Sequence, residues 1–124
     1  MTTKPTLRAF AGFIESIAPD GFDLTSWWSC AIGHGIASGF LVEMERAPGP
    51  LGRPQYGEEY DPEKRKRVPI TGFDAIALYF AIPWQWAEQL FGYIERRGDD
   101  LIVRENETPR TVAARVRKAA EVRS

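Results

Sequence analysis

The chain has 124 residues, enough for one domain with one hydrophobic core, and its 44% hydrophobic and 27% charged residues are typical of a globular protein. A formal net charge of -1 argues against a general nucleic-acid binder, an acidic disordered tail and a membrane-surface helix. No apolar run is long enough for a signal peptide or a membrane span, and the single cysteine fits a reducing compartment, so we expect a cytosolic protein.

The first predicted helix covers residues 6–18. Apolar residues recur there at helical spacing, from Leu7 to Ala18. Pro5 suits the start of a helix, and Pro19-Asp20-Gly21 suits its end.

A second helix should follow Thr25 or Ser26, either of which can cap it, and run through Cys30 to about Phe40. It contains three glycines, each of which costs about 1 kcal/mol relative to alanine inside a helix. We therefore expect a crowded contact with another backbone or a ligand at Gly33, Gly35 and Gly39.

Residues 43–70 interrupt the helical pattern. Prolines and glycines follow one another between Pro48 and Gly57, and a charged run follows them. The pattern predicts a long loop, functional or mobile. A small β element is an open alternative, with 67–70 pairing near Leu51 or Tyr56.

Three further helices are predicted in the second half. Thr71 caps the first, Pro83 starts the second, and Gly92 ends it. After a connection over 93–100, Thr108-Pro109 starts a last helix that reaches about Val122. The fold predicted for residues 1–124 is therefore one compact, mainly α domain of four to five short helices.

Four short motifs occur in order: Phe22-Asp23-Leu24 with Trp27, Cys30-Ala31-Ile32-Gly33-His34, Phe80-Ala81-Ile82 with Ala87 and Leu90-Phe91, and Thr108-Pro109 with Val112-Ala113-Ala114-Arg115. This order resembles a family of small uncharacterised bacterial and phage proteins with a Cys-Ala-x-Gly-His core and a C-terminal Thr-Pro-x-x-Val-Ala-x-Arg helix. Many members carry Cys-Gly-Thr and a further cysteine where this chain has Ser26-Trp27-Trp28-Ser29. The resemblance implies a phage or prophage connection and no particular activity.

Cys30 and His34 are the candidate catalytic residues, because a helix would place them one turn apart on one face. A thiolate–imidazolium pair would be a nucleophile, with Asp23, Glu43 or Asp74 orienting the imidazole. The alternatives are a buried cysteine at a glycine-rich crossing with a hydrogen-bonded histidine, or half of a metal site completed by carboxylates or a second chain. One cysteine and one histidine cannot form a self-contained zinc site, and we expect no metal and no cofactor.

Tryptophans and a basic run are the candidate binding residues. Trp27 and Trp28 diverge by about 100° on a helix, so at least one of them should be partly exposed; the same holds for Trp84 and Trp86. An exposed tryptophan is either a hot spot for a protein partner or a cover over the core edge. The run 64–67 is either a phosphate contact or part of a charge-balanced surface, since acidic residues precede it.

These patterns predict a small cytosolic, non-enzymatic binding or regulatory module that acts on a protein partner. Its predicted binding surface consists of Trp28, Tyr56, Tyr60, Lys64, Arg65 and Trp86. The competing hypothesis is a thiol-dependent enzyme or redox-sensitive protein that uses Cys30 with His34. Nucleic-acid binding is the weakest candidate, and the sequence leaves a homo-oligomer open.

Overall fold

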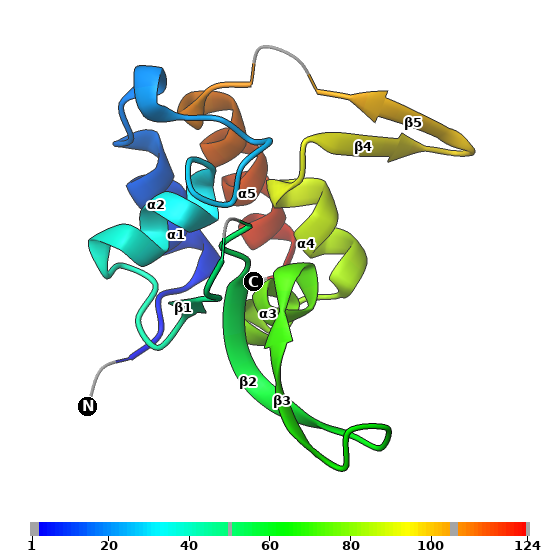
Figure 1. Ribbon diagram of the computed structural model, residues 1–124. Helices are drawn as coiled ribbons and strands as arrows, with labels where there is room; N and C mark the ends of the chain where they lie inside the picture. The colour runs from blue at the N-terminus through cyan, green and yellow to red at the C-terminus, as the bar shows by residue number, and fades with distance from the viewer. Residues whose placement is uncertain (1–2, 50, 105–106, 124) are drawn as a thin grey trace.

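The computed structural model describes residues 3–49, 51–104 and 107–123. Within these ranges the chain forms five α-helices, one 3-10 helix and five strands (Figure 1). In chain order they are α1 (Leu7–Glu15), η1 (Pro19–Gly21), α2 (Ala31–Ser38), β1 (Glu45–Arg46), β2 (Pro54–Asp61), β3 (Lys66–Thr71), α3 (Gly72–Phe80), α4 (Trp84–Phe91), β4 (Ile94–Arg97), β5 (Asp100–Val103) and α5 (Pro109–Arg123). The prediction of a mainly α fold is wrong, because the chain combines helices with two antiparallel sheets.

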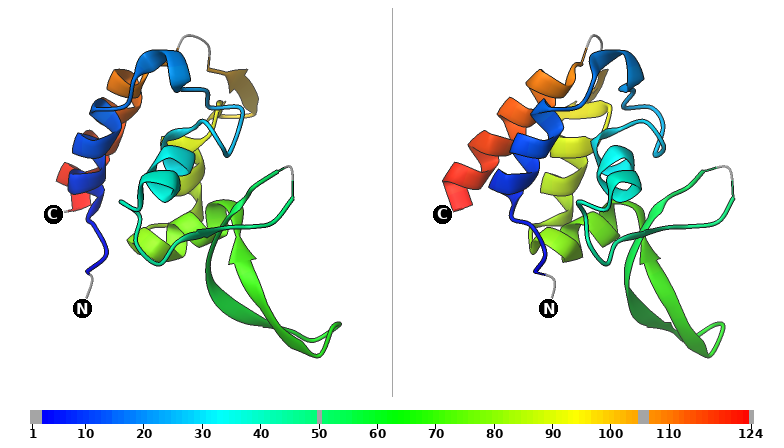
Figure 2. Two further views of the ribbon diagram at one scale, coloured as in Figure 1. Left: turned by 60° about the vertical axis from the view of Figure 1, so that its left-hand side comes forward. Right: turned by 90° about the vertical axis from the view of Figure 1, so that its left-hand side faces the viewer.

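The helices surround one apolar core. α1 and α5 lie side by side in every view, and α2, α3 and α4 complete the body (Figures 1 and 2). Each helix contributes buried residues at helical spacing, as in Leu7, Phe10, Ala11 and Ile14 of α1. The predicted helices are present with two boundary corrections. α1 ends at Glu15 rather than at residue 18. α2 does not begin after Thr25 or Ser26 and does not run through Cys30, because residues 25–30 form turns and bends and Cys30 is its N-cap. Among the described residues no helix has both the length and the apolar character needed to cross a membrane.

The crowded contact predicted at the glycines of α2 is present at Gly33 and Gly35 but not at Gly39, where a Cβ would have no neighbour within 4 Å. A Cβ atom on Gly33 would lie 2.1 Å from the Trp27 carbonyl oxygen, and one on Gly35 would lie 2.6 Å from the Leu41 side chain. Gly39 ends the helix in a left-handed conformation, with φ of 82°. The first two glycines therefore allow close packing, and the third allows the helix to stop.

The region 43–70, predicted as a long loop with a small β element as the open alternative, contains β1, β2 and β3 in one antiparallel sheet with β2 in the middle. The predicted loop is wrong and the β alternative is found, since β3 pairs with the strand that contains Tyr56. Pro69 is tolerated because β3 is an edge strand, where a missing N–H need not break the ladder. Gly57 adopts φ of 76° within an irregularity of the β2–β3 pairing. In the turn, the Asp61 carboxylate accepts hydrogen bonds from the N–H groups of Glu63 and Lys64. These prolines and glycines shape a hairpin, which we call the β2–β3 arm (residues 54–71), and it projects from the body (Figure 1).

A second hairpin replaces the predicted connection over 93–100. β4 pairs with β5 from Ile94↔Val103 to Arg97↔Asp100, and Gly98 takes φ of 60° in the two-residue turn. The dipeptide Gly98-Asp99 between two short runs is a hairpin signal. The strand itself is not predictable from its residues, because the four residues of β4 are mostly charged and do not alternate between polar and apolar.

The glycines offer a matched test of this packing. Gly33→Ala should lower the free energy of unfolding by more than about 2 kcal/mol, because the alanine Cβ would overlap backbone atoms of Trp27 and Trp28. Backbone atoms cannot move away as a side chain can by changing rotamer. Gly12→Ala in α1 is the control: its Cβ has no neighbour within 4 Å, so it should stabilise the protein by about 1 kcal/mol. Urea unfolding followed by tryptophan fluorescence measures both. Equal midpoints for the two variants would show that α2 does not approach this loop.

Candidate functional site

Cys30 is the N-cap of α2 and is only 2% exposed. Burial raises the pKa of its thiol, and the N–H groups of Gly33 and Ile32 offset this effect only in part. A nucleophilic cysteine needs the opposite shift, because the thiolate is the reactive form.

His34 is engaged elsewhere. Its Nε2 lies 2.7 Å from the Gly21 carbonyl oxygen, and since a carbonyl only accepts, Nε2 carries the proton and donates it. Asp23, one of the carboxylates expected to orient the imidazole, instead accepts hydrogen bonds from Thr25 N and Oγ1, which lower the pKa of Asp23. This geometry corresponds to the buried cysteine and hydrogen-bonded histidine among the sequence alternatives.

Trp28 is 50% exposed, but Arg46 covers one face of its indole. The Arg46 guanidinium lies 3.8 Å from the ring centroid and donates to the Gly33 carbonyl oxygen at 2.9 Å. Gly52, with φ of 57°, packs against the indole edge, where a Cβ would lie 2.7 Å from Nε1. Trp28 therefore connects the loop before β2 to the start of α2.

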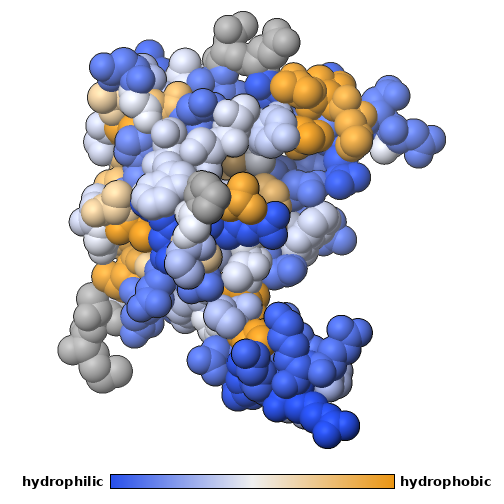
Figure 3. Space-filling view, viewed as in Figure 1, coloured by the Kyte–Doolittle hydropathy of each residue, from blue (hydrophilic) through white to orange (hydrophobic). Residues whose placement is uncertain are grey.

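Four predicted binding residues lie on the β2–β3 arm. Tyr56, at its base, packs edge-on against Tyr79 with a centroid distance of 4.9 Å, whereas Tyr60 is 60% exposed. Lys64 and Arg65 occupy the exposed turn at the tip. Acidic residues of the arm balance these cations, and the projecting end of the arm is mostly hydrophilic in Figure 3.

Trp86 lies apart from both groups, half-buried on α4. It lines a groove of about 480 Å³ between α4 and α5, which we call the α4–α5 groove. The lining residues are Gln85, Trp86, Gln89, Leu90, Arg115, Lys118, Ala119 and Val122. The structure therefore does not unite the predicted binding surface: Trp28, the residues of the β2–β3 arm and Trp86 occupy three separate places.

The α4–α5 groove has an apolar floor and a cationic rim. Trp86, Leu90 and Ala119 supply apolar surface, and Val122 at the edge is 70% exposed. Lys118 is exposed on the α5 side, and among the described residues it makes no ion pair. This groove could not be predicted from the sequence, because its two walls, residues 85–90 and 115–122, are far apart along the chain.

Two arginines fix the groove by binding the C-terminal carbonyl groups of α4. Arg115 donates from Nη2 to the Leu90 carbonyl at 3.1 Å and from Nη1 to the Glu107 carboxylate at 2.9 Å. Arg104 donates to the carbonyl oxygens of Gln89 and Gly92, and burial lowers the pKa of Arg104. Cations satisfy the unpaired carbonyls at a helix end, so α4 is held firmly against α5.

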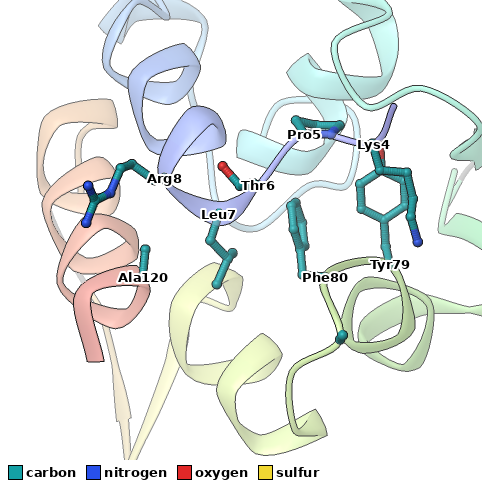
Figure 4. Close-up of a pocket in the computed structure, with 9 residues that line it drawn as sticks. Lys4, Pro5, Thr6, Leu7, Arg8, Tyr79, Phe80 and Ala120 are labelled. Carbon is teal, nitrogen blue, oxygen red and sulfur yellow. The ribbon is translucent and has the colours of Figure 1, made fainter. Parts of the chain in front are cut away.

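A larger hollow of about 680 Å³ lies beside the start of α1, with Leu7, Phe80 and Ala120 on its walls (Figure 4). Two of its polar lining residues, Tyr79 and Lys4, are engaged in contacts within the protein. Burial raises the pKa of Tyr79 to about 12, so its hydroxyl stays protonated and donates to the Val42 carbonyl at 2.8 Å. The Lys4 ammonium lies over the ring of Tyr56, 4.8 Å from its centroid. Arg8 also lines the hollow and makes no hydrogen bond or ion pair among the described residues, so the hollow offers a single uncommitted cation rather than several polar groups converging on a ligand.

α3 and α4 form a helix-turn-helix arrangement, joined by residues 81–83. Ala81 takes the left-handed conformation with φ of 55°, and Ile76, Ile82 and Leu90 are buried. Such a motif often binds duplex DNA, but its charges here are unfavourable: the only charged residues in 72–91 are Asp74 and Glu88. The two helices therefore offer no cation to a phosphate.

Another exposed apolar surface, which the sequence analysis did not predict, lies on the β4–β5 hairpin, where Leu101 is 61% and Val103 57% exposed (Figure 3).

No group of three or more His, Cys, Asp or Glu side chains in the described part of the chain could hold a metal ion. Comparisons of the chain with protein-family models, curated proteins and solved structures found no match. The resemblance to a bacterial and phage family therefore stays a prediction.

The burial of Cys30 has a kinetic consequence. Because its thiol pKa is raised, less thiolate forms at any given pH, and the reagent must also reach a side chain that is 2% exposed. The native thiol should react with a chromogenic disulfide more slowly than the urea-unfolded chain between about pH 7 and 9, and His34→Gln should not slow it further. A native rate above the unfolded rate below neutral pH would instead reveal an activated thiolate.

Proposed function

We propose that this protein is a small, non-enzymatic binding module that acts on a protein partner through the α4–α5 groove. One observation carries the proposal: half-buried Trp86 and exposed Val122 border a groove that the described part of the chain leaves open to solvent. Tryptophan and arginine are the residues most enriched at the energetic centre of protein interfaces, and the groove has one of each.

The rim supports the same proposal. Polar and charged side chains, Gln85, Gln89 and Lys118, surround the apolar floor, as in the polar rim around the apolar centre of an interface. Because Arg115 of α5 binds the Leu90 carbonyl at the end of α4, the groove is formed before a partner arrives, and this lowers the entropic cost of binding.

The proposal includes a cytosolic location and a phage or prophage connection. The location rests on the single, buried cysteine, which fits a reducing compartment. The phage connection rests on the family resemblance alone. The buried thiol and the hydrogen-bonded imidazole give no support to the competing thiol enzyme.

Site-specific photocrosslinking in lysate of the source cell tests the proposal. A photoreactive phenylalanine analogue at Gln85 or Val122 should give one discrete crosslinked protein, whereas the same analogue at Tyr60, also exposed, should not. Trp86→Ala should reduce the yield at least about tenfold, as expected for a hot-spot residue. Trp84→Ala is the matched control, since Trp84 lies on the same helix, is 39% exposed and does not line the groove.

A crosslinked protein obtained from Tyr60 and not from the groove positions would contradict the proposal. A band at twice the mass of the chain would identify the partner as a second copy. Melting curves of both tryptophan variants establish that each is folded before the yields are compared.

A further inference from the structure

We infer that the partner segment bound in the α4–α5 groove is an amphipathic helix with acidic residues beside its apolar stripe. This inference rests on the proposed function and specifies the class of partner. It follows from the shape of the groove, the absence of a free backbone edge in its walls and the charge of its rim.

The walls of the groove suit a third helix. Residues one turn apart line both sides, as in Trp86 and Leu90 on α4 and Lys118 and Val122 on α5. α4 has eight residues and is about 12 Å long, so the groove accommodates about two turns of a partner helix. A helix presents apolar anchors at i and i+4, which match this spacing.

An extended strand does not suit the groove. A strand binds by pairing its backbone with free N–H and C=O groups. The backbone groups inside α4 and α5 are paired within each helix. At the C-terminal end of α4, Arg115 and Arg104 take the carbonyl groups of Leu90 and Gln89.

The charge of the rim selects an acidic partner. The described residues that line the groove include two cations, Arg115 and Lys118, and no carboxylate, whereas Arg110 and Arg117 act on Glu15 of α1. Glu107 pairs with Arg115 and Glu15 pairs with Arg117, while Lys118 at the groove has no ion pair among the described residues. A partner carboxylate near Lys118 gains a charge-assisted contact, whereas a partner lysine or arginine is repelled.

A displayed helix library tests the inference. Peptides on a helical scaffold, randomised at their outward positions, are selected against the full chain at low salt. The enriched sequences should have apolar residues at i and i+4 with Asp or Glu beside them, and raising the salt to about 0.5 M should weaken their binding several-fold.

Charge-reversal variants locate the binding. Lys118→Glu should weaken the enriched peptides at least tenfold, and replacing their flanking acids with lysine should restore binding to that variant. Lys64→Glu is the matched control, because Lys64 is an exposed lysine at the tip of the β2–β3 arm, and it should leave the affinity unchanged. Both lysines are exposed, so neither substitution threatens the fold.

Enrichment of basic or uncharged helices, absence of enrichment over the blank support, or equal loss of binding in the two variants would each overturn the inference. Binding of a duplex DNA probe that Lys118→Glu abolishes, with no helix enriched, would overturn it in favour of nucleic acid. The photocrosslinking experiment distinguishes failure of this inference from failure of the proposed function. A groove-dependent crosslinked protein without an acidic-helix preference refutes the inference and leaves the proposed function standing, whereas loss of both results refutes both.

Discussion

The burial of Phe10 holds much of the molecule together. Its side chain is fully buried, and its ring centroid lies 5.6 Å from that of Phe80 and 5.7 Å from that of Phe91. Phe13 and Phe40 each lie 6.0 Å away. Because these rings come from α1, α3, α4 and the segment after α2, one aromatic cluster fixes four parts of the chain. Deleting a ring buried in this way costs about 3–5 kcal/mol, a large fraction of the stability of a small domain.

Around this centre the chain divides into a packed body and two projecting hairpins. Helices with a buried apolar face build the body, and guanidinium groups hold α4 at its C-terminal end. The β2–β3 arm and the β4–β5 hairpin carry mostly exposed side chains, since they leave the core instead of covering it (Figure 1). The α4–α5 groove belongs to the body, and Arg104, which directly follows β5, ties the C-terminal end of α4 to the base of the β4–β5 hairpin.

The helices could be predicted from the sequence because each has apolar residues at helical spacing and a recognisable start or stop, such as Thr6 or Gly92. The strands could not, since side chains that face solvent on both sides of a hairpin do not alternate. All four residues of β5 are exposed, and Pro54 suggested a loop where it occupies a strand position. Gly57 and Gly98 are local signals for a bulge and a turn, but neither identifies the strand with which its own strand pairs.

The candidate site shows the same limit. Trp86 could be singled out because it alternates with Trp84 on one helix, but its neighbours Lys118 and Val122 come from a distant segment. Cys30 and His34 attracted attention through their spacing, yet burial and the Gly21 carbonyl determine their chemistry. Spacing along the chain predicts which side chains are close; it does not predict which of them solvent can reach.

α5 has two roles that link binding to folding. Val112 and Val116 are buried in the core, while Lys118 and Val122, one or two turns further along, border the groove. A molecule held in the groove therefore also clamps the last helix onto α4, and its binding energy is added to the free energy of unfolding. Chains without a partner unfold more often and are cleared sooner by cellular proteases. Under the proposed function, the level of this protein in a cell follows the supply of its partner, with no change in the rate at which it is made.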